Sequence, residues 1–164
     1  MTPIDRRPAP LSRWASFLAA LVAVGASGLY SYPSLALGVL GLSILSLALW
    51  RGSNAGVTTG AFAIFLGALL TGAWAGPVVP TLVSITGAVL AWDFGVSAIG
   101  LGAQLGREAE TGRLEGVHLA ASTGIGVASA GIGYGLYSAG TGGQPVAALI
   151  FLLLSAVLLL YALG

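Results

Sequence analysis

The sequence contains no cysteine and no lysine, and only 7% of its 164 residues are charged. The absence of cysteine excludes disulfides, thiolate metal sites and cysteine nucleophiles. With no lysine and no basic stripe, the chain has nothing that would neutralise a run of phosphates, and a net charge of +1 gives no argument for nucleic acid. We therefore expect no nucleic-acid partner.

Most residues of the chain are apolar. Hydrophobic residues make up 57% of it, and its mean hydropathy is +0.97. Soluble proteins carry roughly a quarter of their residues as charges, so this composition falls far outside their range. The sequence predicts a multi-pass protein of the cell membrane whose main partner is the lipid bilayer.

Proline, glycine and charged residues divide the chain into six apolar segments. Each segment is close to the length of about 20 residues that a helix needs to cross the hydrocarbon core of a bilayer. We predict an all-α transmembrane bundle with a cytoplasmic tail over 1–13 and a single helical domain over 14–164. The predicted helices cover 14–32, 34–50, 56–76, 80–104, 117–138 and 145–163.

The arginines give this arrangement an orientation. If the N-terminus is cytoplasmic, all six arginines fall on the cytoplasmic side, and the three remaining loops carry no basic residue. Both termini are then cytoplasmic. A rival interpretation takes Arg6-Arg7 and the apolar run after it as a cleaved signal. Pro8 and Pro10 after the arginines, and a poor cleavage region at Ala26-Ser27-Gly28, favour a retained first helix.

Asp93 is the one charged residue that lies deep inside a predicted span. It follows Pro80 by thirteen residues and precedes Gln104 by eleven, which places it near the bilayer midplane. An ionised acid there costs on the order of 3 kcal/mol on insertion scales, so Asp93 must be paired, hydrated or protonated. It is either a proton or cation relay, or a contact for a ligand's cationic group, or a neutral acid that donates a hydrogen bond to a neighbouring helix.

A polar stripe runs along the face of the fourth helix that carries Asp93, and we expect this face to point into the bundle. Small residues at Gly87, Ala91 and Gly95 flank the stripe and would let another backbone approach. The stripe contains Thr86, Asp93, Ser97, Gly100, Gln104 and Arg107.

Two further residues complete a candidate intramembrane polar site. The indole N–H of Trp92 could cap a buried acceptor, or its ring could face lipid. His118 is the sole histidine; it could join a chain from Arg107 or Glu115 to Asp93, or it could be interfacial. The candidate site is therefore Asp93, Trp92, Ser97, Gln104, Arg107 and His118.

The fifth span is rich in glycine, and two interpretations of it compete. Fragments such as Gly133-Tyr134-Gly135 resemble pieces of nucleotide or filter motifs, but no strand, P-loop lysine or pore-helix pattern accompanies them. The pairs Gly126-xxx-Ala130 and Gly131-xxx-Gly135 instead indicate close helix packing in lipid. The charged segment 107–115 before it is either a solvated helical hairpin or a docking surface for a soluble partner.

No catalytic set is recognisable. The sequence has no Gly-x-Ser-x-Gly elbow, no His-Glu-x-x-His and no second membrane-embedded acid to pair with Asp93. We expect no enzyme activity, no cofactor and no metal.

Four short stretches resemble an uncharacterised family of small haloarchaeal polytopic membrane proteins. They are Ile4–Pro8, Ala91–Gly95, Gln104–Ala109 and Gly143–Ala147. The resemblance implies genes beside AAA-type ATPases and transglutaminase-like or von Willebrand-type membrane proteins, and it brings no known activity. We therefore expect an accessory or scaffolding subunit of a membrane complex, with other membrane proteins or a cytoplasmic ATPase as partners. The alternative is a small transporter or channel that uses Asp93.

Overall fold

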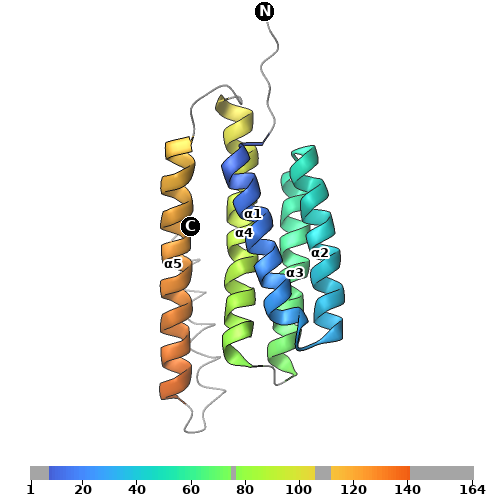
Figure 1. Ribbon diagram of the computed structural model, residues 1–164, viewed down its shortest axis with the longest axis vertical. Coiled ribbons are helices and arrows are strands. Elements are labelled where there is room, and N and C mark those ends of the chain that lie inside the picture. Colours follow the sequence, from blue (N-terminus) through green and yellow to red (C-terminus); the bar gives the residue numbers. More distant parts are fainter. Residues whose placement is uncertain (1–7, 75–76, 106–111, 141–164) are drawn as a thin grey trace, which may run out of the picture. The chain divides into compact units, whose positions relative to one another are not determined.

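The computed structural model describes residues 8–74, 77–105 and 112–140, and within these residues the chain is all-α (Figure 1). Five helices follow one another: α1 (Pro10–Gly28), α2 (Tyr32–Arg51), α3 (Asn54–Ala73), α4 (Val78–Leu105) and α5 (Gly112–Ala139). All five are long and apolar enough to cross a membrane, as expected of a membrane protein. The chain divides into two compact units, Met1–Gly131 and Ile132–Gly164, and the packing described below lies within the first.

Five of the six predicted spans correspond to these helices, with shifted ends. The largest shift of one end is in α5, which begins at Gly112 rather than at 117. The helix α1 is shifted at both ends: it begins at Pro10 rather than at 14 and ends at Gly28 rather than at 32. Proline suits the first helical position because its missing N–H is not needed there. The helix thus starts inside the predicted 1–13 tail and includes Arg13. The predicted span 145–163 lies outside the described residues.

The described helices alternate in direction, and short turns join α1 to α2 and α2 to α3. Ser31 and Ser53 cap the N-termini of α2 and α3, where their hydroxyls accept hydrogen bonds from Ser34 and Gly56. Gly52 ends α2 in the left-handed conformation at φ 68°, which glycine adopts without strain. As a result, Arg13, Arg51 and Arg113 lie at the same end of the first unit (Figure 1).

Glycines allow the backbones of α2 and α3 to touch. A methyl group on Gly60 of α3 would come within 2.6 Å of the Leu45 backbone nitrogen, and one on Gly41 of α2 within 2.5 Å of the Gly60 carbonyl oxygen. Neither glycine can be replaced without moving a backbone. This is the close approach that small residues provide between helices in lipid, where hydrophobic burial gives helices little reason to associate.

The contact between α1 and α4 follows the same rule and confirms the small-residue face predicted for α4. Gly87 lies against the Ala19 carbonyl and Ala23 of α1, and Gly95 against Ser16 and against Val57 of α3. Ala91 is fully buried. The predicted spacing of small residues therefore marks the face of α4 that enters the four-helix bundle.

Buried hydroxyl groups tie these four helices together. Ser16 Oγ donates to the Ala91 carbonyl at 2.6 Å, and Ser84 Oγ donates to the Ala23 carbonyl at 2.8 Å, which links α1 and α4 twice. Thr71 Oγ1 of α3 donates to Ser34 Oγ of α2 at 2.8 Å. Each bond pairs a polar group that would otherwise be left unsatisfied in an apolar environment.

Candidate functional site

The helix α5 is attached to the other four by much less packing than they share. Glu115 is its one buried residue among those described, and no part of its apolar span is buried. It approaches α4 closely at Gly126, where an added methyl group would lie 3.2 Å from Thr86 Cγ2. Gly124, Gly131 and Gly135 would meet nothing within 4 Å among the described residues, so of the predicted glycine pairs only Gly126 has a packing partner there.

One attachment of α5 is a hydrogen-bonded cap on α1. The Glu115 carboxylate accepts from the Ser12 backbone N–H at 2.7 Å and from Ser12 Oγ at 2.9 Å, and both residues are buried. The first turn of α1 has no side-chain cap of its own, because Ala9 occupies the N-cap position. A carboxylate is well suited there, since it accepts free N–H groups and faces the positive end of the helix dipole.

The second attachment brings together two residues of the predicted polar site. His118 Nε2 of α5 lies 3.1 Å from Asp93 Oδ2 of α4, with 37% and 33% of the two side chains exposed. Both atoms are themselves covered, yet they do not align as a hydrogen bond and have no other hydrogen-bond partner among the described residues. The contact is therefore a close electrostatic contact between a carboxyl group and an imidazole, and neither atom uses its capacity to form a hydrogen bond.

Trp92 points away from this pair. Its Nε1 donates to Thr58 Oγ1 of α3 at 3.1 Å, so the indole N–H links α4 to α3 rather than capping Asp93. The ring is 44% exposed. Phe94, on the other side of Asp93, is buried and meets the His118 ring edge-on at 6.4 Å between centroids.

The rest of the predicted stripe spreads along the side of α4 rather than gathering at Asp93. Thr86, Ser97 and Gly100 are half-buried and Gln104 is exposed, whereas Arg107 lies outside the described residues. The expectation that this stripe points into the bundle is therefore wrong for Gln104. Asp93 itself faces α5, one of the six helices of the predicted bundle, because the small residues of α4 take the side toward α1 and α3.

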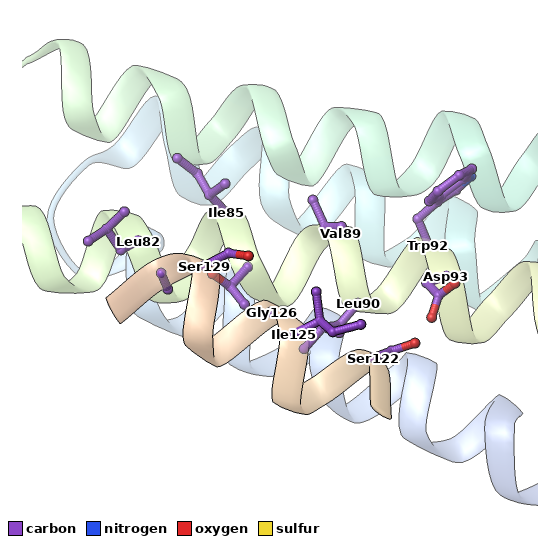
Figure 2. Close-up of a pocket in the computed structure, with 12 residues that line it drawn as sticks. Leu82, Ile85, Val89, Leu90, Trp92, Asp93, Ser122, Ile125, Gly126 and Ser129 are labelled. Atoms are coloured by element: carbon purple, nitrogen blue, oxygen red, sulfur yellow. The ribbon is translucent and has the colours of Figure 1, made fainter. Parts of the chain in front are cut away.

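A groove with a volume of about 440 Å³ runs between α4 and α5 beside Asp93 (Figure 2). Its α4 wall carries Leu82, Ile85, Val89 and Leu90, and its α5 wall carries Ile125 and Gly126. Asp93, Ser122 and Ser129 add polar atoms to it. Both serines lie on the line of α5 that His118 begins, and the loose packing of α5 leaves the space open.

Sequence reasoning missed the roles of Glu115 and Ser12. From the sequence, Glu115 is interpreted as part of a solvated charged hairpin, and Ser12 is placed in the N-terminal tail. A signal was available, because a helix that starts at Pro10 without a polar N-cap needs an acceptor from elsewhere. Among the described residues, no three His, Asp or Glu side chains lie together in a way that could hold a metal ion.

Comparison with known proteins gives a family but no activity. No curated protein and no solved structure matches the chain. The model of one family, described as a family of unknown function, matches residues 6–160. Since that match covers nearly all of the 164 residues, the chain belongs to the family of unknown function DUF7519.

Proposed function

We propose that the protein is a non-enzymatic accessory or scaffolding subunit of a membrane complex. The observation that carries this is the contrast in burial between α5 and the other helices. Val117 and Val127 of α5 are each more than three-fifths exposed, while the four-helix bundle beside them has a closed core. A helix with so few contacts of its own is suited to receive a helix from another membrane protein.

Site-specific crosslinking tests this proposal directly. A photo-crosslinking residue in place of Val127 should capture a defined membrane polypeptide in native membranes. The control is the same residue in place of Val39, a valine of α2 that is 50% exposed against 62% for Val127. Absence of any product at Val127, or the same products at both positions, would contradict a docking role for α5.

The proposal includes six membrane crossings with both termini in the cytoplasm of a cell-membrane protein. Its support is the gathering of Arg13, Arg51 and Arg113 at one end of the first unit (Figure 1), since basic residues favour the cytoplasmic side. The chain contains no cysteine, so single cysteines can be added without background. A cysteine at Tyr32, which is 89% exposed, should react with an impermeant reagent from outside, whereas cysteines at Asn54 and Gly112 should not. Reaction at Gly112 from outside would refute the orientation.

A cytoplasmic ATPase would bind at this same charged end of the first unit. Arg113 and Leu114 are exposed at the start of α5, within the predicted docking segment 107–115, most of which lies outside the described residues. The Val127 crosslinker and a second one at Leu114 would separate a membrane partner from a soluble one.

The second candidate is a small transporter or channel, favoured by the 3.1 Å approach of His118 to Asp93. For an accessory subunit, purified protein in sealed vesicles should pass no more protons or cations than empty vesicles do. A flux that Asp93→Asn abolishes would overturn the accessory role and establish the transporter.

A further inference from the structure

The groove between α4 and α5 has the size and lining of a small-molecule site. Its volume of about 440 Å³ falls within the roughly 300–1,000 Å³ typical of such sites. Most of its walls are aliphatic. A few polar groups line it from both helices, Thr86, Trp92 and Asp93 from α4 and Ser122 and Ser129 from α5, and such groups fix a ligand's orientation. In Figure 2, Leu82 and Ile85 lie toward one end and Asp93 toward the other.

The charge of this lining has one sign. Asp93 is the single ionisable residue among those that form the groove wall, and no arginine or histidine joins it there. A carboxylate at one end of a mostly aliphatic groove interacts strongly with a cation, because the low local dielectric weakens the field little. An anionic ligand would be repelled, and a neutral one would gain nothing from the charge.

His118 leaves part of the carboxylate free for such a ligand. Its Nε2 lies beside Oδ2, and that oxygen is covered. The exposed third of the Asp93 side chain is therefore contributed by its other atoms, which include Oδ1. His118 is not among the described residues of the groove wall, and Ser122 and Ser129 offer hydroxyl acceptors along α5.

The length of the groove sets the shape of the ligand. From Asp93 to Leu82 the α4 wall covers eleven residues, or about 16 Å at the rise of an α-helix. An extended alkyl chain of about a dozen carbons spans a similar distance. Because both helices are long and apolar enough to cross a membrane, the ligand would enter from the lipid phase.

We propose that the groove binds a lipophilic amine, with its ammonium group on the Asp93 carboxylate and its alkyl chain along Leu82, Ile85 and Ile125. The site does not depend on the accessory role, since a docked partner on the outer face of α5 and a ligand between α5 and α4 use different surfaces. It also requires no transport.

Equilibrium binding of a matched pair of probes tests the proposal. Tritiated dodecylamine and tritiated dodecanol share the alkyl chain and differ in charge. Each is bound to the purified full chain immobilised in detergent, and binding to protein-free detergent is subtracted. Dodecylamine should bind about tenfold or more tightly than dodecanol, as a charge pair in an apolar site allows.

Substitutions then locate the site. Asp93→Asn keeps the shape of the side chain and should abolish the preference for the amine, whereas Asp93→Glu should keep it. Asp5→Asn, the same chemical change in the N-terminal tail, should have no effect. Ile125→Trp fills the groove and should weaken both probes, while Val127→Trp on the exposed face of α5 should weaken neither.

Three results would overturn the proposal. Equal binding of amine and alcohol would mean that the groove selects apolar chains and ignores charge. A preference that survives Asp93→Asn would place the cation elsewhere. Failure of both probes to bind would mean that something else occupies the groove, for example the apolar segment 145–163 of the same chain.

Discussion

The four-helix bundle of α1–α4 and the helix α5 use the same kinds of residue in opposite ways. Within the bundle, glycines bring backbones into contact, and buried serines and a threonine bond across the interfaces. In α5 the glycines are more frequent, yet most of them face no described atom. Polar contacts at Glu115 and His118 and one close approach at Gly126 hold the part of this helix that belongs to the first unit.

The comparison shows that glycine content by itself does not mark a packed interface. A small residue stabilises a helix pair in lipid only when another backbone comes close enough to gain van der Waals contact. Where no helix does so, the same residues leave an open face and a groove. The substitutions below test this difference, beginning with the largest expected effect.

Gly60→Ala should destabilise the protein strongly, because the added methyl group would meet the Leu45 nitrogen and the Gly41 carbonyl oxygen at 2.6 and 2.7 Å. Overpacking of this kind costs about 1–3 kcal/mol. The matched change Gly124→Ala meets nothing within 4 Å and should be neutral or add up to about 1 kcal/mol of helix stability. Reversible unfolding in mixed detergent micelles measures both. A loss at Gly124 as large as that at Gly60 would show that the open face of α5 is packed after all.

Glu115→Ala should have the next largest effect, about 1–3 kcal/mol, because it removes a buried acceptor from two Ser12 donors. Ser12→Ala removes only the hydroxyl donor and should cost less, since the Ser12 N–H keeps its acceptor. Gln104→Ala, which truncates an exposed polar side chain, serves as the control, with no measurable change expected. A double-mutant cycle between Glu115 and Ser12 gives their coupling energy. A coupling near zero would mean that the Ser12 hydroxyl contributes nothing to the attachment of α5 to α1.

Asp93→Leu should cost about 1 kcal/mol, because His118 Nε2 then loses the group it approaches. Asp93→Asn should be close to neutral, since an amide oxygen can replace the carboxylate oxygen at the same place. Thermal unfolding of the three proteins in detergent decides the order. Equal stability of all three would show that the contact contributes nothing to attaching α5.

Trp92→Phe should have the smallest effect, about 0.5 kcal/mol, because it removes one partly exposed hydrogen bond to Thr58 and keeps an aromatic ring. Thr58→Val removes the same bond from the α3 side and should match it. The two changes together should cost no more than either alone. Additive losses in the unfolding free energy would mean that the indole and the hydroxyl act separately.

Much of the fold could be predicted because in a membrane the constraints on sequence are local. A helix that crosses lipid must be apolar over its whole length, so the ends of α2 and α3 come within a few residues of their predicted places. The small-residue face of α4 was predicted on the same grounds. The predicted start of α1 was wrong because hydropathy does not locate the start of a helix when that start is set by a proline.

The candidate site was less predictable. Asp93 stands out in the sequence because charge deep in a span is costly, and His118 was one of several partners considered for it. Their 3.1 Å approach depends on the angle at which α5 lies against α4, and no local pattern contains that angle. The prediction for Trp92 is limited in the same way, because its position in the sequence does not determine whether the indole turns toward α3 or toward Asp93.

The residues alone determine that this is a membrane protein of apolar helices, that its basic residues separate from its apolar spans, and that Asp93 is energetically exceptional. They do so because hydropathy and charge act on each segment by itself. The tertiary structure decides that Glu115 caps α1, that Asp93 faces His118, and that a groove remains between α4 and α5. These features come from the meeting of segments far apart in the chain, where backbone distance and side-chain direction set which groups can pair.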